Sequence, residues 1–167
     1  MTTLLQTDYR TRNMALSDLL SADAVLGTIS ATNRKQALQI LCEAAASRLE
    51  LDSREILDAV MDRERLGSTG VGDGVAIPHA RLDGISGVFG LFARLKTPID
   101  FDAIDGRPVD LVFLLLAPEA ASTEHLKALA RVSRVFRRED VRARLRSTET
   151  RDGMVALLAQ EASSDAA

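Results

Sequence analysis

The sequence predicts a single layered α/β domain with a mixed β-sheet, and three observations support this fold class. Helical patterns come first, strand patterns follow in a glycine-rich region, and helical patterns then return. The run from Val109 to Leu116 is almost continuously apolar, which indicates a central strand covered on both faces. The 167 residues suffice for one core, because a chain of this size buries roughly 70% of its unfolded surface.

The expected elements follow from apolar periodicity and from glycine and proline positions. Helices are expected at 33–49 (capped by Thr32 or Asn33), from Asp52 or Ser53 to about Leu66 (stopped by Gly67), 122–136 (capped by Ser122 or Thr123), 140–145 and 151–160. Strands are expected at 75–77, 88–95, 99–101 and 109–116. The domain then spans 16–160, preceded by a flexible extension at 1–15, in which Met14 is a possible alternative start, and followed by a frayed tail at 161–167.

Composition excludes several classes of protein. A single cysteine, Cys42, rules out disulfide and zinc-finger frameworks, and no apolar stretch is long enough to cross a membrane. Because the first residues also lack a secretory signal, we expect a cytoplasmic protein. The formal charge of −3 gives no basic field for nucleic acid. Eight arginines lie in 131–151, where we expect solvated helix faces or, as the alternative, a docking face for an acidic protein.

The segment from Gly67 to Arg81 carries the strongest chemical signal. It matches neither a phosphate-binding Walker loop nor a dinucleotide fingerprint, although it holds four glycines. His79 follows Pro78, whose ring fixes its own φ and leaves the local backbone little freedom. Imidazole is a good nucleophile at neutral pH, so a histidine held there is suited to accept a phosphoryl group. The alternative is a strand-end histidine without a role.

The motifs Arg-Glu-Arg-Leu-Gly-Ser-Thr-Gly-Val-Gly (63–72) and Gly-Val-Ala-Ile-Pro-His-Ala (74–80) make a family resemblance visible. They resemble the mannitol/fructose-type enzyme IIA of the phosphoenolpyruvate-dependent phosphotransferase system, and the layout is most similar to its nitrogen-regulatory branch. The resemblance implies an α/β sandwich with helices on both faces of the sheet. It also implies that His79 accepts phosphate from an HPr-like histidine phosphocarrier protein.

The same resemblance suggests further residues for the site. His125 matches a second family histidine and would stabilise the phosphoryl oxygens, whereas its alternative is a solvated histidine on a helix. Arg63 would line the pocket, although an exposed helix-end cation is the alternative. Ser68 and Thr69 are candidate donors near the phosphate, and Arg81 stands where many relatives have lysine.

The function expected from these residues is reversible phosphorylation of His79 without a cofactor or metal. A nitrogen-regulatory-type enzyme IIA would control target proteins through its phosphorylation state. Two alternatives stay open: a sugar-specific enzyme IIA that passes phosphate to a IIB domain, and a binding module with a degenerate site. A metal site built from both histidines and a carboxylate is disfavoured, because no ligand spacing supports it. The sequence leaves the oligomeric state, the targets and the phosphorylated nitrogen open.

Overall fold

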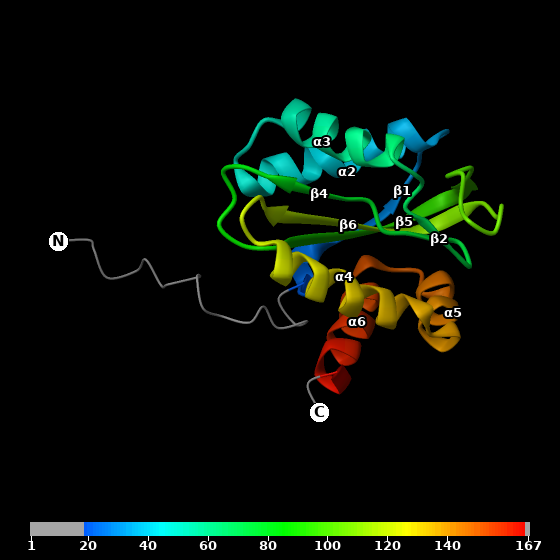
Figure 1. Cartoon of the computed structure of the whole chain (residues 1–167). Coiled ribbons are helices and arrows are strands. Elements are labelled where there is room, and N and C mark those ends of the chain that lie inside the picture. Colours follow the sequence, from blue (N-terminus) through cyan, green and yellow to red (C-terminus); the bar gives the residue numbers. More distant parts are fainter. Residues whose placement is uncertain (1–18, 166–167) are drawn as a thin grey trace.

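A six-stranded sheet between two layers of helices forms the molecule (Figure 1), for which a computed structural model describes residues 19–165. The elements in chain order are the 3-10 turn η1 (Ala22–Ala24), β1 (Val25–Ile29), α2 (Arg34–Leu49), α3 (Ser53–Arg65), β2 (Gly70–Gly72), β3 (Val75–Ala76), β4 (His79–Leu82), β5 (Phe89–Ile99), β6 (Val109–Pro118), α4 (Ser122–Arg137), α5 (Glu139–Ser147) and α6 (Arg151–Asp165).

The sheet is mixed, as the sequence predicts. Its strand order is β1-β5-β6-β3-β2, and β4 pairs with β6 beyond the short β3. β5 and β6 are antiparallel, whereas β3 and β4 run parallel to β6. β6 therefore lies at the centre and supports the strand that begins with His79.

Two apolar cores cover the two faces of the sheet. Leu111, Phe113 and Leu115 of β6 pack into the core that α4, α5 and α6 complete. Val112 and Leu114 alternate with them and pack into the core under α2 and α3. Each strand residue points to the face opposite its neighbour, so one apolar run supplies both cores. The prediction of a sandwich with helices on both faces is confirmed.

Several element boundaries differ from the expectation. The strands β1, β2 and β4 were not expected from the sequence. β1 lacks a recognisable pattern because it has only five residues and Gly27 interrupts it at a φ of 101°. The expected separate strand at 99–101 is wrong, because β5 continues to Ile99. α4 begins after Ala121, which makes no side-chain cap, so a cap at Ser122 or Thr123 is also wrong.

The C-terminal end of the chain also differs from what the sequence predicts. The frayed tail expected from residue 161 is wrong for 161–165, because α6 continues to Asp165. Glu161 is buried there and pairs with Arg138, and Ala162 packs into the core under the sheet. The extension expected at 1–15 lies outside the described residues.

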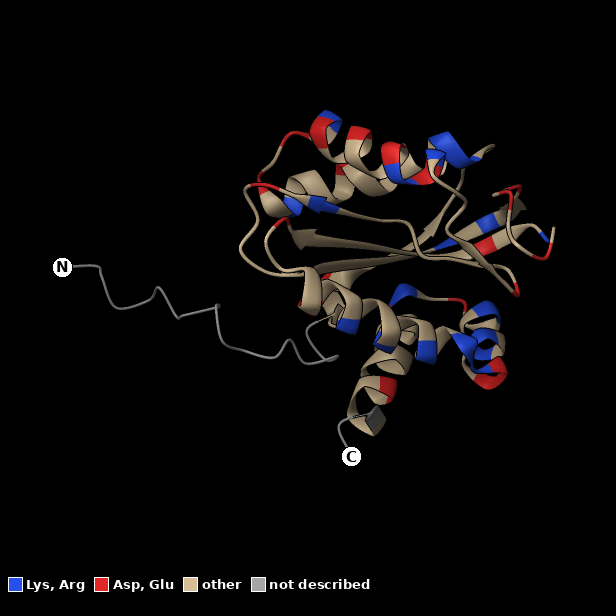
Figure 2. Ribbon diagram, viewed as in Figure 1, with Lys and Arg blue, Asp and Glu red and all other residues tan. Residues whose placement is uncertain are grey.

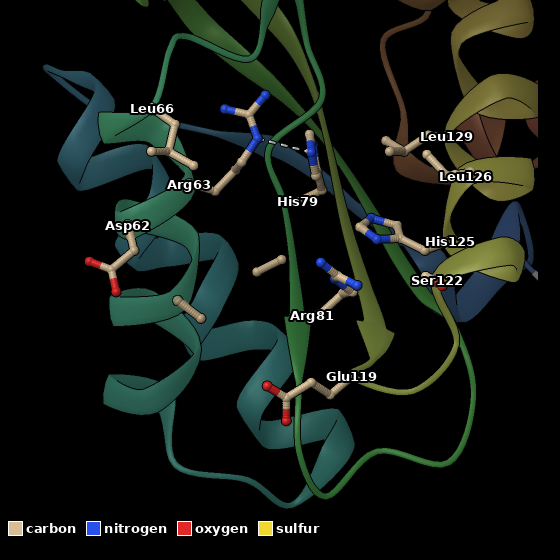
Figure 3. Close-up of a pocket in the computed structure, with 12 residues that line it drawn as sticks. Asp62, Arg63, Leu66, His79, Arg81, Glu119, Ser122, His125, Leu126 and Leu129 are labelled. Atoms are coloured by element: carbon tan, nitrogen blue, oxygen red, sulfur yellow. Dashed lines mark hydrogen bonds between the residues drawn. The ribbon is translucent and has the colours of Figure 1, made fainter.

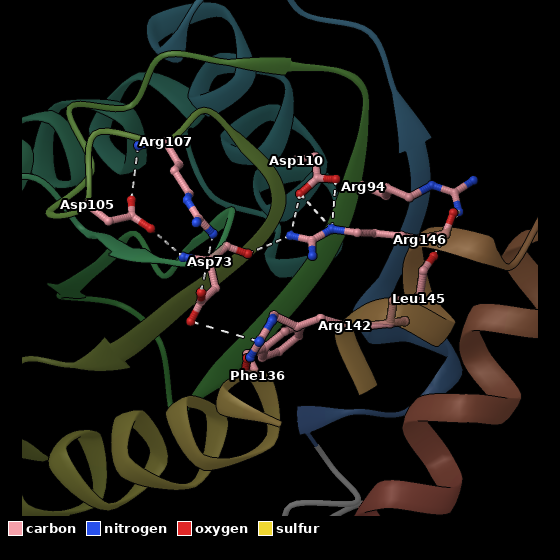
Figure 4. A network of polar contacts seen from close by, with 9 residues as sticks. All are labelled: Asp73, Arg94, Asp105, Arg107, Asp110, Phe136, Arg142, Leu145 and Arg146. Atoms are coloured by element: carbon pink, nitrogen blue, oxygen red, sulfur yellow. Dashed lines mark hydrogen bonds and ion pairs between the residues drawn. The ribbon is translucent and has the colours of Figure 1, made fainter. Parts of the chain in front are cut away.

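Much of the arginine-rich segment holds the fold together. Basic residues gather along α4 and α5 in Figure 2. Arg146 donates hydrogen bonds to the Asp110 carboxylate from Nε and Nη2, at 3.0 and 2.9 Å (Figure 4). Its Nη2 also donates to the Asp73 carbonyl at 2.6 Å. This close approach requires a glycine at position 74, where a Cβ would lie 2.3 Å from Arg146 Nη2. Arg146 is exposed, as expected for a solvated helix face, but its guanidinium also joins α5 to the strands of the sheet.

Arg142 is buried and closes the end of α4. Its Nη1 donates to the carbonyls of Phe136 and Arg137, at 3.0 and 2.6 Å, which lie in the last turn of that helix (Figure 4). The last carbonyls of a helix have no partner within it, so this side chain satisfies groups that water does not reach easily. A continuous basic face through 131, 134, 138 and 142 does not form, because α4 ends at Arg137 and α5 begins at Glu139.

Replacing Arg142 tests this structural role. Arg142→Ala is expected to lower the free energy of unfolding by about 1–3 kcal/mol, because two carbonyls lose their donor. Arg144→Ala removes the same charge from an exposed position of the same helix and is expected to change it by less than about 0.5 kcal/mol. Urea denaturation of both variants measures the difference, and equal losses would contradict the capping role.

Candidate functional site

An open cleft of about 840 Å³ lies where α3, β4 and α4 meet (Figure 3). Charged, polar and apolar side chains line it: Ala59, Asp62, Arg63, Leu66, His79, Ala80, Arg81, Glu119, Ser122, His125, Leu126 and Leu129. The structure thus brings together three of the residues expected from the sequence, namely Arg63, His79 and His125. They come from three different elements that only the tertiary fold makes neighbours.

The His79 ring is held by a hydrogen bond at each nitrogen. Nδ1 lies 2.9 Å from the carbonyl oxygen of Ile77, and the Arg63 Nε–H donates to Nε2 over 3.2 Å. Because a carbonyl only accepts and a guanidinium only donates, these partners assign the ring proton to Nδ1 and a lone pair to Nε2. Nε2 is therefore the nucleophilic nitrogen.

The surroundings keep His79 uncharged at neutral pH. Burial lowers the pKa of the imidazole below its usual 6.5, and the positive charge of Arg63 lowers it further, against an opposing effect of the hydrogen bond to Ile77. A lower pKa favours the neutral ring, whose Nε2 lone pair can attack an electrophile.

The loop after α3 fixes the position of Arg63. Besides its contact with His79, Arg63 donates from Nη1 to the carbonyl of Gly67 at 2.8 Å. The neighbouring Glu64 is buried, lies 3.5 Å from the Arg34 guanidinium, and accepts a hydrogen bond from the Thr69 hydroxyl. This buried carboxylate ties the helix end to the loop and so limits how far Arg63 can move.

Ser68 and Thr69 lie near the cleft in sequence but do not line it. The Ser68 hydroxyl donates to the Phe101 carbonyl and accepts from the Gly70 amide at 3.0 Å. The Thr69 hydroxyl is bound to Glu64, and only 4% of the residue is exposed. Both hydroxyls are thus occupied in holding the loop.

His125 is buried beside His79. Its ring centroid lies 5.4 Å from that of His79, with the two rings at 68°, and only 7% of the residue is exposed. Its Nε2 is buried, and no residue in the range 19–165 forms a hydrogen bond with it. Burial, followed by the charges of His79 and Arg81, lowers its pKa to about 4. A buried polar atom without a partner is costly, so an unpaired Nε2 at this cleft indicates a place for a ligand atom.

Other residues of the cleft were not singled out as functional from the sequence. Arg81 follows His79 by two positions on β4, and this period-2 spacing was the available signal. Glu119 enters from the loop after β6. Leu66 and Leu126, which are 85% and 68% exposed, present apolar side chains from α3 and α4. No spacing in the sequence indicated a role for Glu119, Leu66 or Leu126.

The described part of the chain contains neither a cluster of metal ligands nor a membrane-spanning helix. Among residues 19–165, no three His, Cys, Asp or Glu side chains lie close enough together to hold a metal ion. In the same range, no helix has the length and apolar character needed to span a membrane.

The lowered pKa of His125 predicts how acid affects stability. Between pH 6.5 and about 4 the unfolded chain binds a proton at this residue that the folded chain does not, so folding stability falls as the pH drops through this range. In His125→Gln this contribution is absent, and the loss of stability between pH 7 and 5 should be smaller. Urea denaturation at both pH values measures it, and equal losses in the two proteins would contradict the shifted pKa.

Comparisons with known proteins give a consistent family and fold for this chain. The family model described as "Phosphoenolpyruvate-dependent sugar phosphotransferase system, EIIA 2" matches residues 18–161. A nitrogen regulatory protein of Bradyrhizobium diazoefficiens is 47% identical over 146 residues, which cover 87% of this chain and 95% of the relative. A PTS system fructose-specific EIIA component of Haloferax volcanii is 38% identical over 76% of this chain and 83% of its own.

A solved structure confirms the fold. The crystal structure of nitrogen regulatory protein IIA-Ntr from Neisseria meningitidis superposes with a TM-score of 0.79 at 32% identity, covering 86% of this chain and 98% of that one. The family resemblance expected from the glycine-rich motif is therefore confirmed. The chain belongs to the EIIA type-2 family of the phosphoenolpyruvate-dependent sugar phosphotransferase system, and it resembles the nitrogen-regulatory members of that family.

Proposed function

We propose that Nε2 of His79 accepts a phosphoryl group from an HPr-like histidine phosphocarrier in the cytoplasm, and that the phosphorylated chain regulates target proteins. The observation that carries this proposal is the tautomer of His79, whose Nε2 lone pair faces an open cleft while Nδ1 is bound to Ile77. Membership of the EIIA family supports a role in phosphoryl transfer.

The transfer needs no proton to move. The bond between phosphorus and the donor's imidazole nitrogen breaks, and its electron pair stays on the donor, while the lone pair of His79 Nε2 forms the new bond to phosphorus. The Nδ1 proton remains on its hydrogen bond to Ile77. Arg63 loses its contact with Nε2 in this step, and its guanidinium then faces the phosphoryl oxygens.

His125 contributes to the same site from α4. Its buried Nε2 has no hydrogen-bond partner among the residues that the structure describes, and a phosphoryl oxygen on His79 would supply one. A hydrogen bond to this buried atom then forms only when phosphate is present. His125 therefore stabilises the phosphorylated state relative to the unphosphorylated one.

Phosphorylation changes what a partner meets at the cleft. A phosphoryl group adds a charge of about −1.5 to −2. It would do so between two exposed apolar side chains, Leu66 and Leu126, which can contact a docked protein. A target that packs on these leucines would therefore distinguish the two states by charge.

A sugar-specific role remains the second candidate, because the Haloferax volcanii relative is described as a fructose-specific EIIA component. Both roles use His79 in the same way. Incubating the phosphorylated chain with a purified fructose- or mannitol-type IIB domain separates them. Rapid transfer to the IIB domain would favour the sugar-specific role and overturn the proposed regulatory one.

Substitution of each histidine tests the proposal. His79→Gln is expected to abolish acid-labile phosphate after incubation with phosphoenolpyruvate, enzyme I and the histidine phosphocarrier. His125→Gln should still be phosphorylated, but about 10- to 100-fold more slowly, because one oxygen ligand is missing. Radiolabel transfer with rapid sampling measures both variants. Label on His79→Gln at the wild-type level would exclude His79 as the acceptor.

A further inference from the structure

Arg81 is a second guanidinium in the cleft, and the mechanism above leaves it without a role. It stands two residues after His79 on β4, so both side chains leave the same face of the strand with their Cα atoms about 7 Å apart. The residue is exposed and lines the cleft. Within the described residues its guanidinium donates no hydrogen bond, although nearby charges act on it.

Arg81 lies between two groups of opposite character (Figure 3). On one side is Glu119, which lines the cleft just after β6 and lies near Asp83, because β4 and β6 end side by side. Asp83 raises the pKa of Glu119, and the charge of Arg81 opposes this rise. On the other side is His125, whose pKa the same charge lowers. The guanidinium is therefore near both the carboxyl pair and the two histidines.

The oxygens of a phosphoryl group on His79 would need more donors than Arg63 offers. Arg63 already donates from Nη1 to Gly67, which holds it on the α3 side of His79. His125 can contact one oxygen from the α4 side. The remaining direction is along β4, toward Arg81, and a guanidinium is a planar fork that matches phosphate oxygens.

We propose that Arg81 binds the phosphoryl group carried by His79, and that Glu119 with Asp83 serves as its counter-ion while His79 is unphosphorylated. This inference rests on the proposed function. Phosphorylation would then move Arg81 away from the carboxyl pair, which leaves two acidic groups without their cation at the rim of the cleft. The cleft surface would then become more negative than the phosphoryl group alone makes it, because the two carboxyl groups are no longer neutralised. A docked partner would meet this larger change in charge.

The equilibrium constant for phosphoryl exchange with the histidine phosphocarrier measures this stabilisation. Arg81→Gln is expected to lower the constant about tenfold, since a charge-assisted contact to the phosphorylated state is lost. Arg81→Lys keeps the charge without the fork and should give an intermediate value. Arg48→Gln removes the same charge from an exposed position on α2 and should stay within about twofold of the wild type.

A double-mutant cycle tests whether Glu119 acts on phosphoryl exchange through Arg81 or directly through its own charge. Glu119→Gln should raise the exchange constant in the wild-type background, because Arg81 is no longer held by the carboxyl pair. In the Arg81→Gln background the same substitution should have less than half of this effect. Circular dichroism confirms that each variant is folded, and if Arg81→Gln is not, Arg81→Lys supplies both the comparison and the cycle.

Two results would overturn the inference while leaving the proposed function intact. One is an Arg81→Gln constant equal to that of Arg48→Gln, and the other is a Glu119→Gln effect of equal size in both backgrounds. Failure of the proposed function looks different, because the wild-type chain would then carry no phosphate on His79 before any variant is compared. That result would overturn both.

Discussion

The hydrogen bond between His79 Nδ1 and the carbonyl of Ile77 is the contact on which the site depends. It determines which nitrogen carries the proton, and so it turns the lone pair of Nε2 toward the cleft. Pro78 lies between the two partners and restricts the backbone that joins them. The pairing of β4 with β6 places His79 opposite Leu115, which is fully buried at the centre of the sheet, so the backbone that carries the ring is anchored there.

The fold supports this contact from both faces of the sheet. α3 supplies Arg63 from one helical layer, and α4 supplies His125 from the other. Each helix end is held by a buried charged group: the carboxylate of Glu64 ties α3 to the following loop, and the guanidinium of Arg142 closes α4. His125 lies in the first turn of α4, at the opposite end from Arg142, and His79, the proposed acceptor, lies between α3 and α4 at the cleft.

The layered α/β fold and most helices could be predicted from the sequence, because apolar periodicity reports directly which face of an element is buried. The short strands β1 and β4 could not, since they form by pairing with β5 and β6, which are distant in the sequence. β2 could not either, because two of its three residues are glycine. Ser68 and Thr69 show a related limit: closeness in sequence to Arg63 does not determine where a hydroxyl points, and both point to loop partners. His125 is 46 positions from His79, so only a family resemblance could suggest the pair that the tertiary fold brings to 5.4 Å.

The central claim is that Nε2 of His79 is the phosphorylated atom. In the phosphorylated chain labelled with ¹⁵N-histidine, nuclear magnetic resonance detects the one-bond coupling between phosphorus and the nitrogen that carries it. We expect this coupling to belong to Nε2 of His79, while Nδ1 keeps its proton and its hydrogen bond to Ile77. Coupling to Nδ1, or to either nitrogen of His125, would contradict it.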